Sequence, residues 1–177
     1  MGSDHDAVSR RMRPGAWDAT GFLGPDEVLG DRIDADLAIC AELDTTPEAI
    51  GARLLDLLAE ADGESDDAGD GDGDVGYDRF DEAAATHRRI TIRPGDGHAV
   101  TCPWALELDE VCLRGPGGAP TADGFTIVLG DRSLEGHLLT AHLVAVHRFF
   151  GGIESRFRID PVQAVALLDP DWSGSPG

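Results

Sequence analysis

The stretch SLEGHLLTAHLVAVHRFF, residues 133–150, decides the fold that the sequence predicts. Its Leu, Val, Ala and Phe residues cover nearly the whole circumference of a helical wheel, which is typical of a helix enclosed on all sides. Gly151 and Gly152 follow directly and end the helical pattern. We therefore expect a central buried helix that packs on a sheet and is covered by other helices.

Strand patterns precede this helix. RRITIR (88–93) alternates apolar and polar residues, PGDG offers a turn, and HAVTCPW (98–104) predicts the returning strand of a hairpin. LELDEVCLR (106–114) predicts a third strand, and the β-branched FTIVLG (125–130) predicts a fourth. Together these segments predict an antiparallel meander of three or four strands.

Two amphipathic helices are predicted before the strands. The first runs from about Asp26 to Leu43, and the second begins at Thr46 and Pro47, whose residue types suit an N-cap and a first helical turn. Because only a short turn joins them, we expect an antiparallel helical hairpin. Near the end of the chain, Asp160 can cap a final short helix.

The composition divides the chain into five segments. Residues 1–15 are polar and predict a flexible arm, and residues 16–62 carry the helical hairpin. Residues 63–78 are mostly Asp and Gly, cannot bury apolar surface, and predict a disordered acidic linker. Residues 79–170 form a sheet-plus-helix core that makes one domain with 16–62, and residues 171–177 form a tail. The predicted fold class is α+β.

The 177-residue chain is strongly acidic. It has 34 Asp and Glu residues against 14 basic residues, all of them Arg, and a formal net charge of −20. A surface of this sign repels nucleic-acid phosphates and anionic lipids, so we expect neither nucleic acid nor a membrane as a partner. The sequence contains no run of about 18 apolar residues and no apolar leader, which predicts a cytoplasmic protein.

The acid excess also predicts a halophilic protein. Repulsion among carboxylates opposes a compact state at low ionic strength, whereas at about 1 M salt the Debye length is near 3 Å and most of the repulsion is screened. The absence of Lys and Asn fits a GC-rich genome as well. The alternative is therefore an ordinary GC-rich source whose protein carries an acidic linker.

Cysteines and histidines carry the most distinctive chemistry. Cys102 and Cys112 lie on or beside adjoining predicted strands, and the helix that follows bears His137, His142 and His147. Cysteines from a hairpin and histidines from the next helix are the general plan of a structural zinc site. The sequence thus indicates Cys102, Cys112, His142 and His147 as metal ligands, and zinc is the one cofactor that it suggests.

The spacing of these residues also allows an interpretation without metal. Nine residues separate the two cysteines, and histidines five positions apart point about 140° apart around a regular helix, so the last turn would have to distort for both to reach one ion. In this alternative the histidines bond to the backbone, and Cys102 and Cys112 are core thiols, as we expect for Cys40. An odd cysteine count argues against a disulfide framework.

A catalytic alternative uses the same residues. Cys102, which precedes Pro103 and Trp104, could act as a nucleophile with His142 or His147 as its base. However, the chain has no G-x-S-x-G, P-loop or H-E-x-x-H motif. The sequence therefore favours a noncatalytic module, with zinc as a stabilising ion, that acts through protein contacts. The alternative is a small enzyme with a Cys/His site near Trp104.

Several phrases of the sequence occur in an order that resembles a known family. These are GFLGPDE, TPEAIGARLLDLL, CPW, HLVAVHRFFGG and RFRIDP. They are similar to a family of small uncharacterised prokaryotic proteins that share GFL near the start, a C-P-aromatic turn and H-L-x-x-x-H-x-F-F-x-G. The resemblance covers most of the chain outside the arm, linker and tail. It implies a common fold without an established activity, and it draws attention to Cys102, Trp104, His142 and His147.

Overall fold

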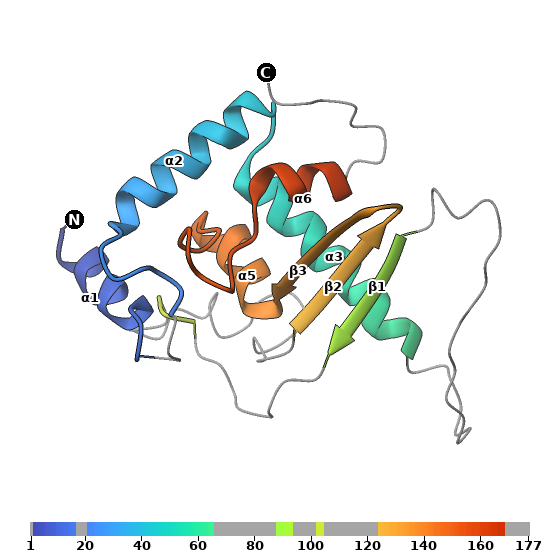
Figure 1. Cartoon of the computed structure of the whole chain (residues 1–177), viewed down its shortest axis with the longest axis horizontal. Coiled ribbons are helices and arrows are strands. Elements are labelled where there is room, and N and C mark those ends of the chain that lie inside the picture. The colour runs from blue at the N-terminus through green and yellow to red at the C-terminus, as the bar shows by residue number, and fades with distance from the viewer. Residues whose placement is uncertain (1, 17–20, 66–87, 94–101, 105–123, 169–177) are drawn as a thin grey trace.

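The structure is a computed structural model that describes residues 2–16, 21–65, 88–93, 102–104 and 124–168 (Figure 1). It has an α+β architecture, in which N-terminal helices and a short C-terminal helix pack with a three-stranded antiparallel sheet, so the predicted fold class is confirmed. Residues 63–65, the first of the predicted linker (63–78), are helical and not disordered, and residues 66–78 and the predicted tail lie outside the described residues.

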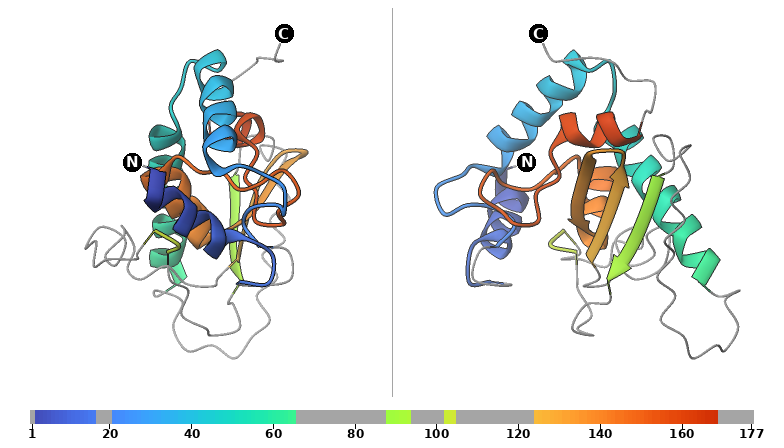
Figure 2. Two further views of the ribbon diagram at one scale, coloured as in Figure 1. Left: turned by 90° about the vertical axis from the view of Figure 1, so that its left-hand side faces the viewer. Right: turned by 45° about the vertical axis from the view of Figure 1, so that its right-hand side comes forward.

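The sheet is a meander in the order β1 (Arg88–Arg93), β2 (Gly124–Leu129) and β3 (Arg132–His137). Apolar residues on one face are in register across the strands, with Ile90 opposite Ile127 and Ile92 opposite Phe125. This inner face is covered by helices on one side of the sheet, as the edge-on view in Figure 2 shows. The alternation that the sequence predicts for β1 and β2 therefore sets which face is buried.

Strand β1 pairs with the strand that the sequence predicts as the fourth. Of the predicted partner HAVTCPW, residues 102–104 form a turn and residues 98–101 lie outside the described part, whereas residues 124–129 pair with RRITIR. The reason is burial: Phe125 and Ile127 are fully buried and give Ile90 and Ile92 an apolar face to match. The third predicted strand, residues 106–114, also lies outside the described residues.

The central helix is shorter than predicted because its first residues belong to β3. Helix α5 spans Leu138–His147, and Ser133 to His137, expected as its start, form a strand instead. Gly130 makes the β2–β3 turn with φ +60°, and Leu134 is buried between exposed neighbours, which is strand periodicity. A Cβ on Gly136 would lie 2.5 Å from the Phe125 ring, so this position needs glycine in the sheet.

Three further helices begin and end near their predicted bounds. They are α2 (Leu29–Glu42), α3 (Pro47–Ser65) and α6 (Pro161–Leu168). The predicted caps are present: the Thr46 hydroxyl accepts the backbone N–H of Ala49 at 3.2 Å, and the Asp160 carboxylate accepts that of Gln163 at 3.0 Å. Within the described part of the chain, no helix has both the length and the apolar character needed to cross a membrane.

The expected antiparallel hairpin of α2 and α3 does not form. The two helices diverge from the turn that joins them, and α3 packs against α5 while α2 contacts α6 and α1 (Figure 1). Gly51 explains this choice, because a Cβ there would lie 2.3 Å from the backbone nitrogen of Ala145. The missing side chain lets α3 approach the backbone of α5 closely.

The N-terminal segment is a helix and not a flexible arm. Helix α1 spans Gly2–Met12, and Val8 and Met12, one turn apart, are buried. The carbonyl of Met12 accepts the backbone N–H groups of Phe22 and Leu23 at 2.8 and 3.0 Å. The prediction failed because a short helix with few apolar residues gives a weak pattern, and contacts from distant residues complete its buried face.

Two apolar clusters meet at α5. The sheet cluster joins the inner face of the sheet with α3, α5 and α6, and Ala141 and Val144 are the α5 residues in it. The N-terminal cluster joins α1, the start of α2, residues 102–104 and the loop after α5, and Leu139 and Leu143 are the α5 residues in it. The predicted enclosure of the central helix is therefore confirmed for Leu139 to Val144.

Candidate metal centre

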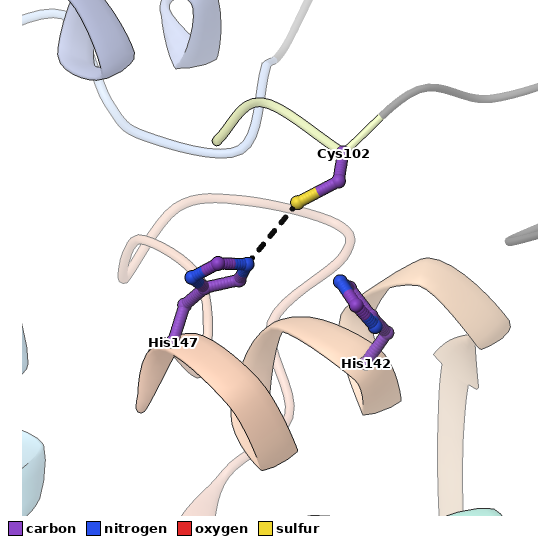
Figure 3. A group of neighbouring side chains, drawn as sticks. All are labelled: Cys102, His142 and His147. Carbon is purple, nitrogen blue, oxygen red and sulfur yellow. Dashed lines mark hydrogen bonds between the residues drawn. The ribbon is translucent and has the colours of Figure 1, made fainter. Parts of the chain in front are cut away.

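Three side chains with metal-binding atoms meet where the N-terminal cluster covers α5. Cys102 lies in the turn of residues 102–104, His142 lies within α5, and His147 is the last residue of that helix. Their ligand atoms all lie within 4.8 Å of one another, and Cys102 Sγ is 3.3 Å from His147 Nε2 (Figure 3). The turn thus places a sulfur atom across two imidazole rings of one helix.

The two histidines converge without a break in the helix. Both lie inside α5, and their ring centroids are 5.5 Å apart with the rings at 70° to each other. The long side chains therefore span the angle between the two positions, and the distortion of the last turn that the sequence suggested is not required. Arg148 ends the helix immediately afterwards in the left-handed region, with φ 59°.

Burial makes both imidazoles suitable as neutral ligands. His142 is 4% exposed, and burial lowers its pKa. The pKa of His147 falls to about 4, first because the ring is buried and second because of the charge that His142 would carry. Both rings are thus neutral at neutral pH, the form in which histidine binds a metal.

The hydrogen bonding of His142 is incomplete. Its Nε2 atom is buried and has no hydrogen-bond partner among the described residues. A buried polar atom without a partner is unfavourable by about 1–3 kcal/mol, and such atoms are uncommon in folded proteins. His142 belongs to the ligand group with Cys102 and His147, so an ion bound through this nitrogen would satisfy it.

Trp104 covers one side of the group. Its indole ring lies parallel to the His147 imidazole, with centroids 4.3 Å apart and an angle of 5° between the planes. Phe149 contacts the same indole in a tilted arrangement at 6.0 Å. Because Trp104 follows Cys102 by two positions, one short turn supplies both the sulfur and the ring that orients His147.

The geometry fits part of a tetrahedral zinc site. A zinc ion bound to sulfur and nitrogen at about 2.0–2.3 Å places neighbouring donor atoms about 3.3–3.6 Å apart. The 3.3 Å separation of Cys102 Sγ and His147 Nε2 matches one such edge. The remaining donors lie within 4.8 Å, so side-chain rotation would be needed to bring them to the same spacing. The described residues supply three donors, and zinc takes four.

The other predicted site residues have different locations. Cys112 lies outside the described residues. His137 ends β3 and packs edge-on against Phe157, with centroids 5.2 Å apart, and it is not a member of the ligand group. Cys40 lies in the sheet cluster, where burial and then the charges of Asp36 and Glu48 raise its pKa to about 11. Cys40 is therefore an unreactive core thiol, as the sequence predicts.

The sequence does not reveal what surrounds the three ligands. Met12 and Val8 belong to the same N-terminal cluster as Cys102, although the first fifteen residues were expected to be flexible. The spacing of four between Val8 and Met12 is the only signal that could have indicated a buried helical face. The stacking of Trp104 on His147 has no sequence signal at all.

Known proteins do not identify this site. No protein-family model matches the chain, and no curated protein or solved structure is significantly similar to it. The geometry of Cys102, His142 and His147 is the feature of this protein that points to a function.

Proposed function

We propose that this protein is a noncatalytic metal-binding module in which Cys102, His142 and His147 hold one zinc ion. The observation that carries the proposal is the buried, unpartnered Nε2 atom of His142 beside the close contact of Cys102 and His147. A core cysteine and two core histidines without a ligand role would be expected to use backbone partners for their buried polar atoms.

Zinc suits this donor set. Thiolate sulfur and neutral imidazole nitrogen are the usual ligands of structural zinc, and carboxylates dominate sites for harder ions such as Mg²⁺ and Ca²⁺. In the described part of the protein, the ligand group contains no carboxylate, although the chain has 34 Asp and Glu residues. Cys112 remains the sequence-based prediction for the fourth ligand.

The proposed role of the ion is structural. It links the turn at Cys102 to the end of α5, positions that are 45 residues apart in the sequence. Because the unfolded chain has no preformed site, the binding free energy of the metal adds to the free energy of folding. The ion thereby fixes residues 102–104 on α5 and completes the N-terminal cluster, to which Cys102 and Trp104 belong.

Metal analysis of the purified chain tests the proposal. We expect about one zinc per chain, and a chelator should lower both zinc content and melting temperature. Cys102→Ser and His142→Gln should each lose the zinc. Cys40→Ser and His137→Gln are matched controls that replace the same residue types outside the ligand group, and they should keep the metal. A protein that binds no zinc, or controls that lose zinc as fully as the ligand variants, would contradict the proposal.

The short distance between Cys102 and His147 favours the alternative function, a small enzyme with a Cys/His site. Cys102 Sγ and His147 Nε2 are 3.3 Å apart, which is within reach for a nucleophile and its base. The low pKa of His147 opposes this role, because an imidazole with a pKa of about 4 is a weak base toward a thiol. A metal-free protein whose Cys102 is alkylated much faster than Cys40, with the difference abolished in His147→Gln, would support the enzyme instead.

Two exposed apolar side chains support a role in protein contacts. Val28 and Ile153 are 57% and 59% exposed, and they are the large apolar residues of the described chain that lie on the surface. They flank Glu27, whose carboxylate accepts the backbone N–H of Ile153 at 2.8 Å. A Val28→Ser and Ile153→Ser double variant should keep zinc and stability but lose the proteins that the wild type retains from its native extract. Equal retention by the two would contradict this role.

A further inference from the structure

We propose that Cys102, His142 and His147 form a complete site for one monovalent copper ion, and that Cu(I) displaces zinc from it. This inference rests on the proposed function, because it assigns a second metal to the same three ligands. Three properties of the site lead to it: the number of donors, the net charge of the loaded site, and the absence of hard ligands.

The number of donors matches Cu(I) better than zinc. The described residues bring three ligand atoms together, one sulfur and two nitrogens. A tetrahedral zinc ion needs a fourth ligand in addition. Cu(I) is a closed-shell soft ion that is satisfied by two or three donors, and sulfur ligands select it. Among the described residues, these three donors suffice for Cu(I), whereas zinc would also need a fourth ligand, for which Cys112 is the sequence-based prediction.

The net charge of the loaded three-ligand site also favours Cu(I) over zinc. With the three ligands of the described residues, Zn²⁺ leaves one net positive charge and Cu⁺ leaves none; a zinc site becomes neutral only with a second thiolate, such as that of Cys112. The ligands lie in an apolar environment, since Cys102 belongs to a cluster with Leu139, Leu143 and Phe149. An uncompensated charge in such surroundings is strongly unfavourable. The low-dielectric cluster therefore favours the monovalent ion.

Within the described residues, the ligand group contains no carboxylate, although carboxylates dominate the composition of the chain. The net charge is −20, yet the ligand group within the described residues has no carboxylate oxygen. In a protein covered with carboxylates, K⁺, Na⁺, Mg²⁺ and Ca²⁺ are attracted to the surface, whereas the ligand group of the described residues offers them no carboxylate. We therefore expect the site to be selective for soft ions over the hard cations that the rest of the protein attracts.

Parallel titrations test the inference. Metal-free protein is titrated anaerobically with Zn²⁺ and, separately, with Cu(I) in competition with a coloured Cu(I) chelator, in sulfate buffer because chloride binds Cu(I). The variants are Cys102→Ser, His142→Gln, Cys112→Ser and the control His137→Gln. X-ray absorption of the loaded protein then counts the sulfur and nitrogen atoms bound to each ion.

We expect one Cu(I) per chain, bound by one sulfur and two nitrogens, with displacement of prebound zinc. Cys102→Ser and His142→Gln should weaken Cu(I) binding by about tenfold or more, and Cys112→Ser and His137→Gln by less than about threefold. A Cu(I) ion bound by two sulfurs, or a large loss in Cys112→Ser, would overturn the three-ligand assignment. Zinc binding without Cu(I) binding would overturn this inference and leave the proposed function intact. Binding of neither ion would overturn both.

Discussion

The indole of Trp104 lies flat on the imidazole of His147, 4.3 Å away and within 5° of parallel. The same turn places Cys102 Sγ 3.3 Å from the Nε2 atom of that imidazole. One three-residue segment therefore both orients a histidine and supplies a second ligand beside it. This arrangement makes Trp104 a positioning residue for the proposed metal centre.

Replacement of Trp104 by alanine should weaken the site, and replacement by phenylalanine should largely preserve it. The loss of a partly buried stacked ring lowers the free energy of unfolding by about 2 kcal/mol and frees the His147 ring to rotate. Zinc affinity and chemical denaturation measured on both variants check this. If Trp104→Ala and Trp104→Phe bind zinc equally well, the stacking does not position the ligand.

The metal-free protein should lose stability as the pH falls from about 6.5 to about 4. The pKa of His147 is lowered from 6.5 to about 4 in the folded state, so in this range the unfolded chain binds a proton that folded His147 does not. Above pH 6.5 the protonation of this residue does not reduce the free energy of unfolding, and between pH 6.5 and about 4 it reduces that free energy progressively. Urea denaturation in the presence of a chelator should give a smaller pH dependence for His147→Gln than for the wild type. Identical slopes would argue against a buried neutral His147.

The close contact of α3 with α5 should be sensitive to one methyl group. Gly51→Ala would place its Cβ 2.3 Å from the backbone nitrogen of Ala145, so we expect a loss of about 3 kcal/mol and weaker metal binding, because α5 carries both histidines. Gly30→Ala is the matched control on α2, where a Cβ meets no atom within 4 Å. The control should gain roughly 0.5–1 kcal/mol from helix propensity. Similar melting temperatures for the two variants would refute the close approach.

Asp36 should be the most important charged residue for stability. Its carboxylate is fully buried and binds Arg32 at 2.9 Å and Arg158 at 2.8 Å, which ties α2 to the loop before α6. Asp36→Asn breaks both buried pairs and should lower the free energy of unfolding by about 3–5 kcal/mol. The control is Asp34→Asn, which replaces an exposed residue on the same helix. It should change the free energy of unfolding by less than about 0.5 kcal/mol. Thermal melts compare the two directly.

The halophilic hypothesis predicts that stability rises with salt. A chain with a net charge of −20 should melt at a higher temperature as KCl increases toward about 1 M, because screening reduces repulsion among its carboxylates. Melting curves in stepped KCl, with sucrose at matched osmolality as a control, measure this. A melting temperature that is the same at low and molar salt would favour the GC-rich alternative.

Local sequence patterns predicted several elements well. The caps at Thr46 and Asp160, the alternation in β1 and β2, and the all-round apolar character of α5 each depend on residues close together in the sequence. The start of α5 was misplaced because Leu134 fits both a helical and a strand period. The flexible-arm prediction failed because the residues that bury Val8 and Met12 are far away in the chain.

The sequence by itself determined the fold class and the strong negative charge, and it indicated Cys102, Cys112, His142 and His147 as candidate metal ligands. These follow from residue types and short periodicities, which do not depend on the path of the chain. Only the tertiary structure decided that α3 packs on α5, that β1 pairs with β2, and that Trp104 stacks on His147. Such choices depend on which apolar surfaces fit together at close range, as at Gly51 and Ala145, and a linear pattern does not encode that fit.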